Sequence, residues 1–180
     1  MKNIIHISVI LAFISINCLA NDTIVFTSKQ KKICFINPGF ELELPLHRKT
    51  SLIINPGIGY NISYPNTSDF TSSGWLYLIA PFVDVQYRFY YNLDKRYTKG
   101  FTNPNSANFI SIRGLYRGKE ITSNFTRTTN NDYSISLNWG FQRVKNKTYY
   151  NFDIGPMYYM DFKGDGGIFI NLEFNIGRLF

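Results

Sequence analysis

The stretch WLYLIAPFVDVQYRFYY, residues 75–91, decides the fold. Side chains on a β-strand alternate between its two faces with a period of two. The odd positions of this stretch carry no charge, whereas the even positions change from apolar to polar and include Asp84 and Arg88. Strands of water-soluble domains usually have about 5–6 residues. The stretch therefore predicts an unusually long strand with one wholly apolar face, which contacts either a protein core or lipid.

The same alternation recurs along the chain and predicts an all-β protein. Seven strands are predicted, at residues 33–46, 52–64, 75–91, 107–118, 133–141, 150–162 and 168–180. Tight turns are predicted at 47–49 and 146–147, and a hairpin turn at 163–167. The polar run KQKK, residues 29–32, also suggests a turn. If both ends of the sheet lie on one side, an eighth strand is required, and residues 22–28 are the candidate.

The first 20 residues have the pattern of a secretory signal peptide. Lys2 precedes an apolar run that ends at Cys18-Leu19-Ala20, and this run is short for a membrane-spanning helix, which needs about 20 residues. An uncleaved anchor and lipidation at Cys18 are the alternatives. Cleavage leaves residues 21–180 as one barrel domain, with a single cysteine, Cys34, and a net charge that falls from +7 to +6.

Two kinds of barrel fit the alternation. A lipocalin-like soluble barrel turns its apolar face inward, and a membrane barrel turns that face outward. The polar faces of the predicted strands contain Gly, Ser, Asn, a few carboxylates and Arg, with almost no Lys. Such residues suit the narrow interior of a small barrel better than a solvated surface, and aromatic residues gather toward strand ends as in interfacial girdles. We therefore predict an antiparallel up-and-down transmembrane β-barrel, of eight strands, exported to the cell outer membrane.

The connections between strands predict an orientation. Short turns at 47–49 and 146–147 alternate with long loops at 65–73 and 119–132. Bacterial outer-membrane barrels have short periplasmic turns and longer extracellular loops. The long loops are therefore predicted to be extracellular, and the basic connection 92–105 falls on the periplasmic side.

The chain resembles the small outer-membrane β-barrel proteins of Bacteroidetes-type bacteria, whose architecture is related to the OmpA-type barrel. The resemblance is carried by PGFELELPL (38–46), by RFYYNLDKR (88–96) and by the closing strand that ends at Phe180. It implies a monomer in contact with outer-membrane lipid and lipopolysaccharide. It also implies recognition of the strand ending at Phe180 by the barrel assembly machinery, although Arg178 departs from that signal. Fold alone does not imply an activity.

The sequence does not predict an enzyme. His47 is the one histidine left after cleavage and falls in a predicted periplasmic turn, whereas barrel enzymes generally need a His at the extracellular rim. No nucleotide or nucleic-acid motif is present, and we expect no cofactor or metal ion. Three functions stay open: a structural or surface-interaction barrel acting through its extracellular loops, a narrow pore or passage for small hydrophobic molecules, and a lipid-modifying enzyme.

The candidate site is a polar network inside the barrel. Strand parity directs the following charged residues inward: Glu41, Glu43, Asp84, Arg88, Arg113, Asp153 and Glu173. The interior of an eight-stranded barrel is just wide enough for side chains to fill it, and buried charges must be paired. We expect Arg88 and Arg113 to bridge these carboxylates and to plug the lumen.

Overall fold

The computed structural model describes residues 26–61, 77–124, 127 and 129–180. The predicted signal peptide, residues 1–20, lies outside this part of the chain. Within the described ranges no helix is long and apolar enough to cross a membrane.

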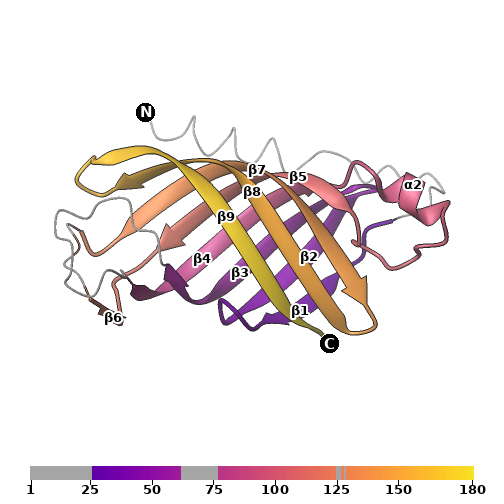
Figure 1. Ribbon diagram of the computed structural model, residues 1–180, viewed down its shortest axis with the longest axis horizontal. Coiled ribbons are helices and arrows are strands. Elements are labelled where there is room, and N and C mark those ends of the chain that lie inside the picture. Colours follow the sequence, from indigo (N-terminus) through magenta and orange to yellow (C-terminus); the bar gives the residue numbers. More distant parts are fainter. Residues whose placement is uncertain (1–25, 62–76, 125–126, 128) are drawn as a thin grey trace, which may run out of the picture.

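Antiparallel strands account for most of the described chain. They are β1 (Gln30–Cys34), β2 (Gly39–His47), β3 (Thr50–Asn61), β4 (Leu78–Phe89), β5 (Asn108–Arg117), β6 (Thr122–Ser123), β7 (Asp132–Lys145), β8 (Thr148–Asp161) and β9 (Gly166–Leu179). Eight of the nine form a ring in which each strand pairs with its neighbours along the chain, and β1 pairs with β9 to close it (Figure 1). The two-residue β6 lies outside the ring, against the start of β4. The prediction of an all-β antiparallel barrel is confirmed at this level.

The source of the eighth strand was predicted wrongly. A turn at residues 35–38 divides the predicted strand 33–46 into β1 and β2, and Asn37-Pro38 in it is a typical turn-forming pair. Of the candidate 22–28, residues 26–28 form no strand, and 22–25 lie outside the described residues. The run predicted as a turn, 29–32, instead contributes most of β1, in which Lys32 is buried.

The two faces of the sheet differ as the alternation predicted. In β4, Asp84, Gln86 and Arg88 are buried inside the ring, while Val83 and Val85 are exposed on its outside. The inward positions of β4 change along the strand. Leu78 and Ala80 pack with Tyr159 of β8 near one end, polar side chains follow, and Tyr90 packs on Phe109 near the other end. Apolar layers thus lie on both sides of a polar middle.

The connections divide between two ends of the barrel. The α2 end carries the turn at 48–49, the β7–β8 turn and the 90–107 connection, which contains the short helix α2 (Leu93–Tyr97) that the sequence did not predict. Arg48 and Lys49 form ion pairs with Asp94 of α2, which holds the turn and the connection together. The opposite end, here the β6 end, carries the 162–165 turn and residues 118–124, and β3 ends and β4 begins there. Figure 1 shows α2 and β6 at opposite ends of the molecule. The described turns are therefore grouped by end as predicted, and the predicted loop 65–73 lies outside the described residues.

Candidate functional site: a polar network inside the barrel

Five strands bring the seven predicted residues into the interior of the ring. Glu41 and Glu43 come from β2, Asp84 and Arg88 from β4, and the other three from β5, β8 and β9: Arg113, Asp153 and Glu173. Six of the seven are buried, and the Glu173 side chain keeps 10% of its surface exposed. Side chains alternate between the two faces of a strand, so each of the seven points into the ring while the residues before and after it point outward. The network divides into two groups, one around Arg113 and one around a lysine that the sequence did not indicate.

Arg113 is the centre of the first group. Its Nε and Nη2 lie 3.0 Å from the two carboxylate oxygens of Asp84, which is the bidentate arrangement that guanidinium groups favour. Its Nη1 forms an ion pair with Glu173 and lies 3.9 Å from Asp153. One guanidinium thus holds three carboxylates, as predicted for this residue. Asn151 and Asn171 donate further hydrogen bonds to Asp153, at 3.2 and 2.9 Å.

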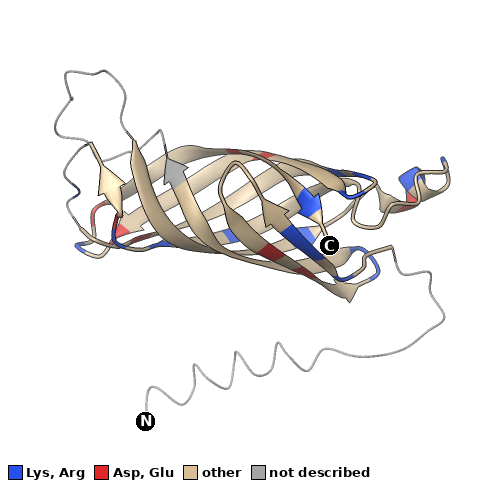
Figure 2. Ribbon diagram, turned by 90° about the horizontal axis from the view of Figure 1, so that it is seen from below, with Lys and Arg blue, Asp and Glu red and all other residues tan. Residues whose placement is uncertain are grey.

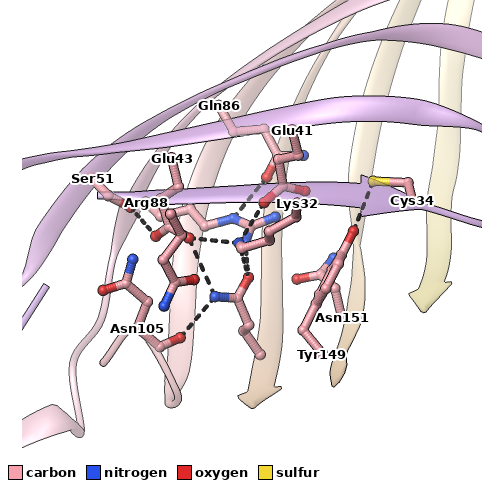
Figure 3. Close-up of polar contacts among 12 residues, drawn as sticks. Lys32, Cys34, Glu41, Glu43, Ser51, Gln86, Arg88, Asn105, Tyr149 and Asn151 are labelled. Atoms are coloured by element: carbon pink, nitrogen blue, oxygen red, sulfur yellow. Dashed lines mark hydrogen bonds and ion pairs between the residues drawn. The ribbon is translucent and has the colours of Figure 1, made fainter. Parts of the chain in front are cut away.

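Lys32 of β1 is the centre of the second group (Figure 3). Its ammonium lies 2.6 Å from Oε1 of Glu41 and 2.7 Å from Oε2 of Glu43, and it donates to Oε1 of Gln142 at 2.9 Å. The three donors of an ammonium group are therefore all used. Sequence reasoning missed Lys32 because the first three residues of β1 are polar, and its last two, Ile33 and Cys34, were assigned to the following strand.

Glu43 is the most fully bonded carboxylate of the interior. Besides Lys32, it accepts hydrogen bonds from Ser51 at 2.7 Å, from the Tyr90 hydroxyl at 2.6 Å and from the Gln142 amide at 3.3 Å. Its side chain is completely buried. A buried carboxylate is stable only when such partners replace its lost water, so Glu43 fixes β2, β3 and the 90–107 connection relative to one another.

Arg88 does not bridge carboxylates, and this part of the prediction was wrong. Within the described residues no carboxylate oxygen lies within the 4.0 Å limit of an ion pair with it. Its Nε and Nη1 donate instead to the amide oxygens of Gln86 at 2.9 Å and Gln142 at 3.0 Å. Its guanidinium also lies 4.2 Å from the centroid of the Phe109 ring. The amide side chains take the place that carboxylates were expected to have.

Two glutamines join the groups into one network. Gln86 accepts from Arg88 and donates to Asp84 at 2.9 Å, which links Arg88 to the Arg113 group. Gln142 accepts from both Arg88 and Lys32 and donates to the backbone oxygen of Asn105 at 2.9 Å. The network therefore runs from the middle of the barrel to the 90–107 connection at the α2 end, where it meets the backbone.

The histidine considered for catalysis does not belong to this network. His47 is exposed at the end of β2. Cys34 is buried, and its sulfur lies 2.7 Å from the hydroxyl of Tyr149. The described residues contain no group of three or more His, Cys, Asp or Glu side chains arranged to hold a metal ion. The arrangement joins buried polar side chains of several strands by ion pairs and hydrogen bonds on the inside of the ring.

No family model, curated protein or solved structure matches this chain. The fold and its interior therefore define the structural class of the protein. It is an all-β protein whose antiparallel sheet closes into a ring around paired polar groups.

Proposed function

We propose that this protein is an integral outer-membrane β-barrel that is plugged by its interior polar network and acts in structural or surface-interaction roles through the loops of its β6 end. The observation that carries the proposal is the reversed polarity of the molecule. Among the described residues, 24 polar or charged side chains are buried against 12 apolar ones. A water-soluble core has the opposite balance, because burial of apolar surface is what stabilises it.

The outer surface supplies the complementary observation. Exposed apolar side chains form a band around the strands, for example Ile135 at 56%, Leu137 at 54% and Leu172 at 65% exposure. Soluble monomers rarely expose a continuous apolar patch of more than a few hundred Å². The strands β3, β4 and β7–β9 have 12 or 14 residues, which is sufficient for a tilted strand to span a bilayer, since about 9–11 are needed.

Aromatic side chains border this band toward both ends. Toward the β6 end, Phe162 contacts Tyr116 and Tyr133 with ring centroids 6.4 and 5.8 Å apart. Toward the α2 end, the indole N–H of Trp139 donates to the hydroxyl of Tyr91 at 2.9 Å. Aromatic residues with polar groups are enriched where a membrane protein passes from hydrocarbon to water. Their placement supports a lipid-facing surface that ends near these two levels.

Two experiments test the proposal. A heat-modifiability gel on outer-membrane fractions is expected to show a folded, faster-migrating band that shifts on boiling, and recovery of the protein only from soluble fractions would reject a membrane barrel. Orientation is tested by epitope insertion. A tag beside Asn130 at the β6 end should be labelled on intact cells, and a tag beside Lys147 at the α2 end should be labelled only after the outer membrane is opened. The reverse labelling would overturn the orientation.

A further inference from the structure

A pocket at the α2 end has cations in its lining and no carboxylate. Its volume is about 530 Å³, and it is lined by Tyr91, Asn92, Lys95, Arg96, Lys99 and Phe101. Figure 2 shows basic residues on α2, which projects beyond the strands. The polar network described above lies inside the ring, whereas Tyr91 continues the outward-facing row of β4 and is exposed. The pocket is therefore separate from the interior network and opens to the outside.

The positive charge of this pocket is not neutralised by the chain. Asp94 is the one carboxylate of α2, and it is engaged by Arg48 and Lys49. None of the three lining cations forms an ion pair within the described residues. Arg96 stacks on Phe101, 4.5 Å from the ring centroid, and its Nε has no hydrogen-bond partner in that part of the chain. Three cationic groups in a small space thus favour an anion with several oxygens.

The position of the pocket indicates what kind of molecule carries the anion. Tyr91, in its lining, bonds to Trp139 on the outer face of β7. Trp139 is 45% exposed there and belongs to the aromatic border of the apolar band. An anion bound beside α2 therefore lies level with the edge of the hydrocarbon, with apolar surface next to it along the barrel wall. That combination suits a phosphate group attached to acyl chains better than a free ion.

We infer that this pocket binds the phosphate-bearing headgroup of an anionic phospholipid in the leaflet that meets the α2 end. The inference rests on the proposed function, because it requires the barrel to be in a bilayer. Lys95, Arg96 and Lys99 contact the phosphate, and Tyr91 and Phe101 pack beside the glycerol and the start of the acyl chains. A bound lipid of this kind fixes the depth and tilt of the barrel at its α2 end.

The test is a binding titration on the full barrel folded in maltoside micelles, which contain no phosphate. Dihexanoylphosphatidylglycerol, dihexanoylphosphatidylcholine and inorganic phosphate are added separately, and the NMR signal of the Trp139 indole N–H reports occupancy. The anionic lipid is expected to move this signal with saturation, and the zwitterionic lipid and free phosphate are expected to bind at least tenfold more weakly. Equal binding of either comparison ligand would overturn the assignment to an anionic phospholipid.

A matched pair of charge variants tests whether the site is local. The triple variant Lys95→Gln, Arg96→Gln, Lys99→Gln should lose on the order of 100-fold in affinity, since one basic residue beside anionic lipid contributes about fivefold. The control Lys29→Gln, Lys31→Gln, Lys147→Gln removes the same charge from exposed positions outside the pocket and should change affinity less than threefold. Equal losses in the two variants would overturn a local site in favour of diffuse attraction.

Folding is checked separately, so that failure of this inference is distinguished from failure of the proposed function. Each variant is examined by heat modifiability and by flotation with phosphatidylcholine vesicles, and the single change Lys99→Gln, with an expected fivefold loss, serves if the triple variant does not fold. A wild-type chain that neither shifts on heating nor floats refutes the membrane barrel itself. A wild-type barrel that floats but does not bind the anionic lipid refutes only the headgroup site.

Discussion

Replacement of Arg113 by Gln should destabilise the barrel far more than replacement of any carboxylate that it holds. Arg113 is bound by Asp84, Glu173 and Asp153, so one cation serves three anions. Arg113→Gln leaves three buried carboxylates close together without a positive partner. Loss of one partner from a buried ion pair costs about 3–5 kcal/mol, and we expect an effect of that size. Asp84→Asn leaves Arg113 with two carboxylates and reduces their mutual repulsion, so its cost should be about 1 kcal/mol, near that of a typical hydrogen bond.

The measurement is urea unfolding of barrels folded into phosphatidylcholine vesicles, followed by tryptophan fluorescence and by loss of heat modifiability. For a denaturant slope of about 2 kcal/mol per M, Arg113→Gln should lower the midpoint by roughly 1.5–2.5 M and Asp84→Asn by roughly 0.5 M. In the double variant, the loss should be at least about 1 kcal/mol smaller than the sum of the single losses, since residues in one ion-pair network couple by about 0.5–3 kcal/mol. Equal costs for the two single variants, or additive costs in the double variant, would refute the assignment of Arg113 as the shared cation.

Three further predictions follow from the two faces of the sheet. Lys32→Met should destabilise the barrel by about 3–5 kcal/mol, because Glu41 and Glu43 lose their cation. Its control, Lys31→Met on the exposed side of the same strand, should change the free energy of unfolding by less than about 0.5 kcal/mol. Similar losses in both variants would argue against the Lys32 group. Leu137→Arg should cost about 2–4 kcal/mol at the lipid face, and correct insertion of this variant at wild-type stability would show that Leu137 does not face lipid. The wild-type barrel should give no steady single-channel conductance in planar bilayers if the buried polar side chains plug it as we propose. Stable conductance steps would contradict the plug.

Much of the fold could be predicted from the sequence because strand alternation is a local property. In β4 the period of two assigned Asp84 and Arg88 to the inside and Val83 and Val85 to the outside without knowledge of any partner strand, and the structure agrees. The same reasoning placed the other predicted carboxylates inside the ring. It also grouped the turns by end, since each antiparallel strand reverses the direction of the chain. Where alternation was weak, in the polar run 29–32, the prediction failed.

The partners inside the barrel were decided by the tertiary structure. Closure of the ring between β1 and β9 sets the register of Lys32, and its contact with Gln142 joins residues 110 positions apart in the sequence. Arg88 points into the ring as predicted, yet its donors meet Gln86 of the same strand and Gln142 of β7 in place of carboxylates. Parity determines which face a side chain occupies but carries no information on its height relative to side chains of other strands. That height depends on how all eight strands are staggered when the sheet closes. Alternation along the recognised strands therefore determined which of their side chains face inward, and the closed barrel decided which of these side chains pair.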